Sequence, residues 1–384
     1  MNDIFVSFPF DGRSESLFKI VHDSAVRRNL NAVRIDQSSP ITFNIADSIH
    51  RKIRESSLII ADLTGNNPNV LNEIGIAQAF GKPLLLVTQG DPKKAPFNVR
   101  HLEIRQYDEN NSLALKEVID SAISETSSDN ERLRAMLVPS TLGHPTRESW
   151  FVIAASPLSF RRATSGGGGY KKLRRTHYDY VGVRGILQSF VLLFGFDALP
   201  DNLDPEDYED DVIRQPMNLY CIASPKANRW PRFILDEYHE RQWVPRLEFR
   251  ADATSKNLQN VKVSIFGDGK ELHPPGWPIN AEGDRYARDF GIVVRGPNPY
   301  HEDQMVAVIA GRGALGTEAA CTAFTDPGCI QEISTRLAGM KVNIENHKQP
   351  FWAMVSMESE LGSGTAEAKK NTLRVEQVEK IIRR

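Results

Sequence analysis

Short apolar runs alternate with segments of helical periodicity over the first 125 residues, and this alternation constrains the fold more than any other feature of the chain. Each run of strand length ends in polar or turn-forming residues and is followed by a longer segment with apolar residues at helical spacing. The expected strands are 4–8, 32–35, 58–62, 84–88 and 102–107, and the expected helices are 17–28, 45–54, 70–81 and 113–124. Five strands joined by helices predict a flavodoxin-like, doubly wound parallel sheet of the α/β class.

The loops that leave the carboxyl ends of three strands are expected to meet at one edge of this sheet. Right-handed crossovers place the loops after residues 8, 35 and 62 there, where open parallel sheets bind their ligands. The residues expected at this edge are Ser7, Phe8, Pro9, Phe10, Asp11, Asp36, Asp62, Asn67, Asn69 and Glu73. Their hydroxyl, carboxylate, amide and aromatic groups predict a polar pocket with aromatic walls.

Two acidic residues of this set have both a structural and a functional interpretation. Pro68 suits the first turn of a helix, and apolar residues recur at helical spacing after it, so Glu73 lies near the positive end of that helix. A carboxylate is stabilised there with or without a ligand. Asp62 ends a buried strand and precedes Thr64 and Gly65, so its side chain either caps the loop or faces a ligand.

Four segments in this part of the chain match one known family in the right order. They are FVSFPFD at 5–11, IADLTGNNPNV at 60–70, EIGIA at 73–77 and PFNVRH at 96–101. On these segments the first third of the chain resembles the nucleoside 2-deoxyribosyltransferase-like family, which is related to TIR domains. The resemblance implies the fold more firmly than the activity, because activities vary within the family.

In catalytic members of these groups, a glutamate on the helix after this strand attacks or stabilises the anomeric carbon of a ribosyl group. By position, Glu73 matches it, and the resemblance implies that Asp62 or Asp36 holds ribose hydroxyls while Phe8 or Phe10 stacks on the base. A carboxylate suits the oxocarbenium-like transition state. NAD is then a suitable substrate, because its cationic base leaves neutral, and no cofactor is expected. The familiar transferases carry a glycine-rich acidic segment where this chain has Asn67-Pro68-Asn69, which disfavours deoxyribosyl transfer.

Length and composition predict two domains in a reducing compartment. The 384 residues are 40% hydrophobic and 25% charged, and the net charge of −2 gives no general attraction to nucleic acid or anionic membranes. Three scattered cysteines and a start without a basic segment predict a cytoplasmic protein, and no apolar run reaches the ~18 to 20 residues of a membrane helix. We expect a first domain at 1–126, a linker at 127–149, a larger, ligand-sensing α/β domain at 150–360 and a charged tail with weak helical periodicity at 361–384.

Two strand ends in the second domain lead directly into helices and are candidates for anion binding. The first supplies Ser224, Lys226, Asn228 and Arg229, and the second supplies Gly311, Arg312, Gly313, Gly316 and Thr317 in a Gly-x-Gly-x-x-Gly pattern. The same pattern suits a tight strand-to-helix turn whose glycines serve packing, and the usual acidic ribose partner is missing at the expected distance. Both interpretations remain open.

The remaining polar features point to no other chemistry. A glycine-rich basic segment lies at 161–175. It either binds a phosphate-rich ligand or a nucleic-acid strand, or it is a solvent-exposed face with no ligand. The histidines lie apart, outside any zinc-hydrolase or serine-hydrolase motif, so no metal site is expected.

Three functional hypotheses follow. In the first, the N-terminal domain hydrolyses the N-glycosidic bond of NAD or a related nucleotide and is gated by the C-terminal domain, which binds an unidentified activating ligand. Such a fusion resembles anti-phage defence effectors with TIR-like domains, which implies self-association into a homo-oligomer. In the second, the pocket binds a nucleotide without cleaving it, as part of a sensor or interaction protein. In the third, the domain is a nucleoside 2-deoxyribosyltransferase or a nucleosidase of salvage.

Overall fold

The computed structural model describes residues 3–9, 14–34, 45–108, 110–139, 141–142, 145, 151–154, 169–203, 209–222, 228–243, 247–251, 263–272, 288–361 and 366–382. The chain divides into two compact units. The N-terminal unit is Met1–Glu131 with Val191–Gly195, and the C-terminal unit is Arg132–Phe190 with Phe196–Arg384. Each unit has its own sheet and core.

The N-terminal unit is built on a five-stranded parallel sheet. Its strands are β1 (Asp3–Ser7), β2 (Asn31–Val33), β3 (Leu58–Asp62), β4 (Leu84–Thr88) and β5 (Ile104–Gln106), in the order β2-β1-β3-β4-β5. The central strand β3 is buried along its whole length, which explains its unbroken apolar run. The sequence prediction of a flavodoxin-like, doubly wound sheet is confirmed.

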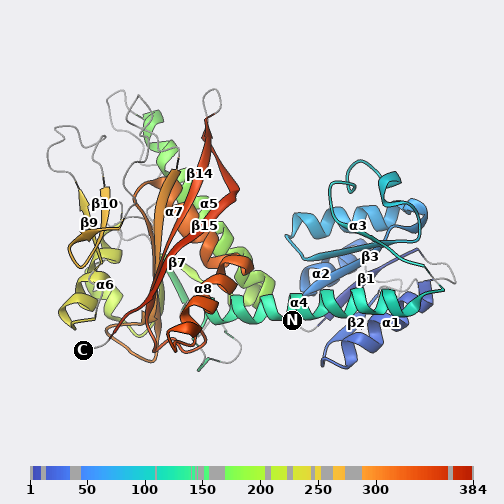
Figure 1. Cartoon of the computed structure of the whole chain (residues 1–384), viewed down its shortest axis with the longest axis horizontal. Helices are drawn as coiled ribbons and strands as arrows, with labels where there is room; N and C mark the ends of the chain where they lie inside the picture. Colours follow the sequence, from blue (N-terminus) through green and yellow to red (C-terminus); the bar gives the residue numbers. More distant parts are fainter. Residues whose placement is uncertain are drawn as a thin grey trace. The chain divides into compact units, whose positions relative to one another are not determined.

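Helices cover both faces of this sheet (Figure 1). They are α1 (Ser14–Val26), α2 (Ile45–Glu55), α3 (Pro68–Ala79) and α4 (Ser112–Leu137), with short 3-10 helices η1 (Thr64–Asn66) and η2 (Pro92–Lys94) in the loops. Side chains alternate along β1: Val6 and Phe8 pack with α1 and α4, and Phe5 packs with α2 and α3. Ser7 therefore points toward the α2 and α3 face. Helix α4 continues past the expected helix at 113–124 into the first part of the linker expected at 127–149, a segment for which we expected partly helical structure.

The C-terminal unit contains a seven-stranded mixed sheet, so it is an α/β domain as predicted. The strands are β6 (Phe151–Ala154), β7 (Asp201–Leu203), β8 (Asn218–Ile222), β12 (Arg288–Pro297), β13 (Met305–Gly311), β14 (Phe351–Leu361) and β15 (Ala366–Lys380), in the order β15-β14-β12-β13-β8-β6-β7. The half that contains β6, β7, β8 and β13 is parallel, and β12, β14 and β15 join it antiparallel. A small antiparallel sheet is formed by β9 (Leu247–Ala251), β10 (Val263–Gly267) and β11 (Lys270–Glu271).

Strand β15 corrects one sequence expectation. Residues 366–380, for which we expected a charged tail with weak helical periodicity, form the edge strand beside β14. Val375 and Val378 of this strand are buried, whereas most of its other described side chains are at least partly exposed. Charged side chains are common on edge strands because they discourage pairing with other chains.

Helices pack on both faces of the larger sheet. They are α5 (Gly169–Phe194), α6 (Arg229–Glu240), α7 (Ala314–Thr325) and α8 (Pro327–Gly339), with 3-10 helices η4 (Phe196–Ala198) and η5 (Asp210–Arg214). Trp230 and Ile234 of α6 share a core cluster with Ile292, Val308 and Trp352 of the sheet. Helix α7 covers the opposite face, with its backbone against β12. None of the helices in the described ranges is long and apolar enough to cross a membrane.

A fully buried arginine fixes the end of α4 within the C-terminal unit. The Arg295 guanidinium donates hydrogen bonds to Met136 O (3.0 Å), Ile344 O (3.0 Å) and Ala135 O, and Tyr220 donates its hydroxyl to Leu137 O. Burial lowers the pKa of Arg295 to about 10. Carbonyl oxygens at the negative end of α4 therefore stabilise the charge of Arg295.

Candidate active site

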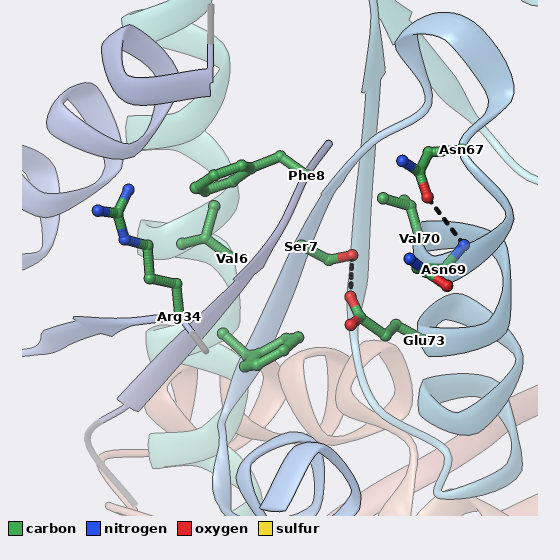
Figure 2. Close-up of a pocket in the computed structure, with 9 residues that line it drawn as sticks. Val6, Ser7, Phe8, Arg34, Asn67, Asn69, Val70 and Glu73 are labelled. Carbon is green, nitrogen blue, oxygen red and sulfur yellow. Dashed lines mark hydrogen bonds between the residues drawn. The ribbon is translucent and has the colours of Figure 1, made fainter. Parts of the chain in front are cut away.

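A pocket opens where the strand order of the N-terminal sheet reverses. Strand β2 lies on one side of β1 and β3 lies on the other, and ligands of doubly wound sheets bind in the crevice at such a point, outside the carboxyl ends of the strands. The pocket measures about 370 Å³ only when the open solvent at its mouth is counted, so it is a shallow crevice and not a closed cavity. Its lining residues, shown in Figure 2, are Phe5, Val6, Ser7, Phe8, Arg34, Asn67, Asn69, Val70 and Glu73.

The start of α3 places three of these polar side chains. Asn67 caps the helix by accepting a hydrogen bond from Asn69 N (2.8 Å), and Pro68 occupies the first helical position. Asn69 and Glu73 are four residues apart and therefore lie on the same face of the helix. The cap and the helical spacing together aim Glu73 toward β1 (Figure 2).

Ser7 and Glu73 form the central contact of the pocket. Ser7, the last residue of β1, is buried and donates its hydroxyl hydrogen to Glu73 Oε2. Burial raises the pKa of Glu73 above its ordinary value, and the hydrogen bond from Ser7 opposes this shift without cancelling it. Within the described residues this is the only hydrogen bond of the Glu73 side chain. The site therefore holds a desolvated carboxylate that a positively charged group next to it would stabilise.

Asp62 lies apart from this pocket and holds its neighbouring loop. Its Oδ1 accepts hydrogen bonds from Thr64 N (2.9 Å) and Thr64 Oγ1 (2.5 Å), and its Oδ2 accepts one from the Tyr107 hydroxyl (2.8 Å). Burial, with the hydrogen bond to Asp62, raises the pKa of Tyr107 to about 12. The turn that follows needs Gly65, whose φ of 75° favours glycine. Of the two interpretations of Asp62, a loop cap or a ligand contact, this geometry is that of the loop cap.

We expect Asp62→Ala to destabilise the N-terminal unit by about 1 to 3 kcal/mol, because the change removes three hydrogen bonds and leaves the Tyr107 hydroxyl without this acceptor. Thermal unfolding followed by circular dichroism measures this effect. The matched control is Asp91→Ala, which removes an exposed loop cap with one hydrogen bond to Lys93 N (3.0 Å). Equal stability of the two variants would contradict a structural role for Asp62.

The other predicted residues of this edge have different outcomes. Phe8 lines the pocket, but its ring also packs into the core and meets Phe18 edge to face at 6.2 Å. Pro9 is not among the lining residues. Phe10, Asp11 and Asp36 lie outside the described residues. The sequence analysis missed Arg34, Phe5, Val6 and Val70, which also line the pocket. Arg34 was placed inside a strand at 32–35, whereas β2 ends at Val33 and Arg34 is the first residue after it.

In the C-terminal unit, the Gly-x-Gly-x-x-Gly segment joins β13 to α7. The buried Asp289 carboxylate accepts hydrogen bonds there from Gly316 N (2.9 Å), Phe290 N (2.9 Å) and Arg312 Nε (3.0 Å). A Cβ atom on Gly311 would lie 2.0 Å from Thr317 N, and one on Gly316 would lie 2.0 Å from Phe290 O. These glycines allow close backbone packing, and a carboxylate of the protein itself already binds the helix amide. This favours the packing interpretation, and a ligand at Gly313 or Thr317 stays a prediction.

The second predicted anion site is described in part. Asn228 is buried and caps α6, accepting from Trp230 N (3.0 Å) and donating to Ile222 O (3.2 Å). Arg229 is exposed and pairs with Asp210 at 2.5 Å. Ser224 and Lys226 lie outside the described residues. In the ranges that the structure describes, no group of three or more His, Cys, Asp or Glu side chains could hold a metal ion.

Comparison with known proteins gives a distant likeness to solved structures. No protein-family model matches the chain, and no curated protein matches it. Among solved structures, the chain is similar to the TIR domains of the activated Roq1 resistosome that directly recognizes the pathogen effector XopQ. The TM-score is 0.22 at 13% sequence identity, and the match covers 32% of this chain and 84% of the other. At this TM-score the likeness carries no argument about function.

Proposed function

We propose that the N-terminal unit hydrolyses the N-glycosidic bond of NAD or a related nucleotide and that Glu73 is its catalytic carboxylate. The observation that supports this most is the partly buried Ser7–Glu73 pair in a pocket at the β1/β3 crevice. A partly desolvated carboxylate in a crevice is a candidate catalytic group, because carboxylates whose pKa is shifted by burial are concentrated at functional sites.

The chemistry requires little beyond this carboxylate. As the bond between ribose C1′ and the nicotinamide nitrogen breaks, the base leaves with the bonding electron pair and becomes neutral. Positive charge develops on the ribose, and the Glu73 carboxylate stabilises it. Water then adds to C1′ and loses a proton. The balanced reaction converts NAD and water into nicotinamide, ADP-ribose and one proton.

Regulation is part of the same proposal. We expect the C-terminal unit to gate the activity after binding an activating ligand, and we expect copies of the chain to self-associate in the active state. Both expectations, and a role in anti-phage defence, rest on the family resemblance of the N-terminal segments. They are tested separately from the chemistry, by asking whether extract from phage-infected cells changes the rate of NAD loss and the oligomeric state.

Cleavage in water enriched in heavy oxygen tests the reaction type. Hydrolysis predicts one heavy oxygen in the ADP-ribose product, detected by mass spectrometry. Transfer to a nucleobase, as the deoxyribosyltransferase form of the salvage hypothesis requires, predicts no heavy oxygen and needs an added base. Tight binding of NAD with no product would favour the hypothesis of a nucleotide-binding protein.

The pH dependence of cleavage should follow the ionisation of Glu73. Because the carboxylate is needed as an anion and burial raises its pKa, activity is present above that raised pKa and is lost as the pH falls through it. Ser7→Ala removes the hydrogen bond that lowers this pKa, so the loss should begin at a higher pH than in the wild type. The measurement is kcat/KM from acid to neutral pH, with Ser57→Ala, a buried serine outside the pocket, as the control. An unshifted profile in Ser7→Ala would count against ionisation of Glu73 as the controlling step.

A further inference from the structure

The pocket carries a cation as well as a carboxylate, and the two come from opposite faces of the sheet. Ser7 points toward α3 and Glu73, whereas Val6 and Phe8 point toward α1. Arg34 lies on this second side, with its guanidinium carbon 4.5 Å from the centre of the Phe18 ring. Figure 2 shows Arg34 and Glu73 on either side of the β1 residues. Of the nine described residues that line the pocket, Arg34 is the only cation.

The packing of Arg34 leaves its guanidinium suited to exchange partners. It stacks on Phe18 and pairs through Nη1 with Glu15 Oε1 at 2.8 Å. The Arg34 side chain is 23% exposed, whereas that of Glu15 is 65% exposed. Ion pairs with an exposed partner contribute little stability, and a guanidinium presents five donors in a planar fork that fits phosphate. A phosphate can therefore replace Glu15 at low cost while the aromatic ring keeps the guanidinium in place.

We propose that Arg34 binds the phosphate on the 5′ side of the ribose, so that the Glu73 pocket selects nucleotides over free nucleosides. This rests on the proposed function, which places ribose C1′ at Glu73. A phosphate is repelled by the Glu73 carboxylate and must lie away from it, and Arg34 supplies the opposite charge across β1. One carboxylate for the ribosyl cation and one guanidinium for the phosphate then define the substrate class as a ribosyl 5′-phosphate or diphosphate.

Phosphate recognition can be tested with three nicotinamide substrates that differ in their phosphate groups. Nicotinamide riboside lacks a phosphate, nicotinamide mononucleotide has one, and NAD has a diphosphate. In the wild type, kcat/KM should rise by about 10- to 100-fold from the riboside to the mononucleotide, the range for hydrogen bonds to charged groups. Arg34→Gln should remove most of this preference, and Arg34→Lys should retain part of it because the charge remains. Glu15→Gln should lower KM for the mononucleotide, since it removes a carboxylate that competes with the phosphate for Arg34.

The matched control is Arg105→Gln. Arg105 is also a surface arginine that pairs with a glutamate, Glu103, at 2.6 Å, but it does not line the pocket. It should keep the wild-type preference. Added salt should reduce the preference in the wild type and have little effect on it in Arg34→Gln. An equal loss for riboside and mononucleotide in Arg34→Gln would overturn the proposal, as would a wild type with no preference.

Measurements of substrate binding test phosphate recognition by Arg34 separately from hydrolysis. In a Glu73→Gln background, calorimetry should show tighter binding of the mononucleotide than of the riboside, and Arg34→Gln should abolish the difference. If no substrate is cleaved but this difference is present, the proposed hydrolysis fails and phosphate recognition stands. If cleavage occurs without any Arg34-dependent difference, the hydrolysis stands and phosphate recognition by Arg34 fails.

Discussion

Glu73→Gln should lower the rate of NAD cleavage by roughly a hundred- to a thousandfold, the loss usually seen when one group that stabilises transition-state charge is removed. Glutamine has nearly the same shape, and its amide oxygen can still accept the Ser7 hydrogen bond, so the pocket should keep its geometry. Only the negative charge is lost. The fall should therefore appear mainly in kcat, measured as nicotinamide release, with a small effect on KM.

The stability of the same variant gives an independent check. Burial raises the pKa of Glu73, so the ionised side chain destabilises the folded state at neutral pH, and this cost disappears as the pH falls through the raised pKa. Removing the charge should leave the unfolding temperature equal to or above that of the wild type at neutral pH. The control Glu103→Gln alters an exposed carboxylate and should change neither activity nor stability. A Glu73→Gln protein that is stable and fully active would contradict the assignment of Glu73.

Arg295→Ala should lower the free energy of unfolding of the C-terminal unit by about 3 to 5 kcal/mol. The side chain is fully buried, and its truncation leaves a cavity and removes hydrogen bonds from carbonyl oxygens of Ala135, Met136 and Ile344. The end of α4 would then be left with unsatisfied acceptors in the core. Chemical denaturation followed by tryptophan fluorescence measures the change, because all five tryptophans lie between Trp150 and Trp352, inside the C-terminal unit.

Two variants test the cause of this loss. Arg295→Lys keeps the positive charge, but an ammonium group cannot reach carbonyl oxygens in several directions as a guanidinium does. Its loss in free energy of unfolding should therefore lie between that of Arg295→Ala and that of a surface substitution. Arg232→Ala removes a 72% exposed arginine paired with Asp236 and should alter the unfolding free energy by less than about 0.5 kcal/mol. If Arg295→Ala were as stable as Arg232→Ala, the end of α4 would not depend on this side chain.

The N-terminal sheet could be predicted from sequence because each of its signals is local. Parallel strands buried on both faces appear as continuous apolar runs, such as Leu58 to Ala61, and the helices between them keep apolar residues at helical spacing. The carboxyl ends of such strands meet at one edge, so Ser7, Asn67, Asn69 and Glu73 could be grouped without a structure. Arg34 was missed because the sequence predicts a strand that continues to residue 35, which places Arg34 inside it. In the structure β2 ends at Val33, so Arg34 is the first residue after the strand.

Interactions between distant segments could not be predicted. The structural role of Asp62 depends on Tyr107, which reaches it from a loop after β5, 45 residues away. The Gly-x-Gly-x-x-Gly turn was ambiguous because the carboxylate that binds its helix amide comes from Asp289, on another strand. The edge strand β15 was misassigned because its buried residues Val375 and Val378 are three positions apart, where the β14–β15 pairing shifts register, so the sequence lacks the strict alternation of a strand.

Nicotinamide release from NAD by the purified 384-residue chain at high protein concentration, with Glu73→Gln measured in parallel, tests most directly whether Glu73 is catalytic. A second pair of samples receives extract from phage-infected cells, so that an activating ligand is supplied. We expect release by the wild type in at least the second pair and a loss of release in Glu73→Gln. Folded wild-type protein that releases no nicotinamide under either condition, or a Glu73→Gln variant that matches it, would contradict the central claim.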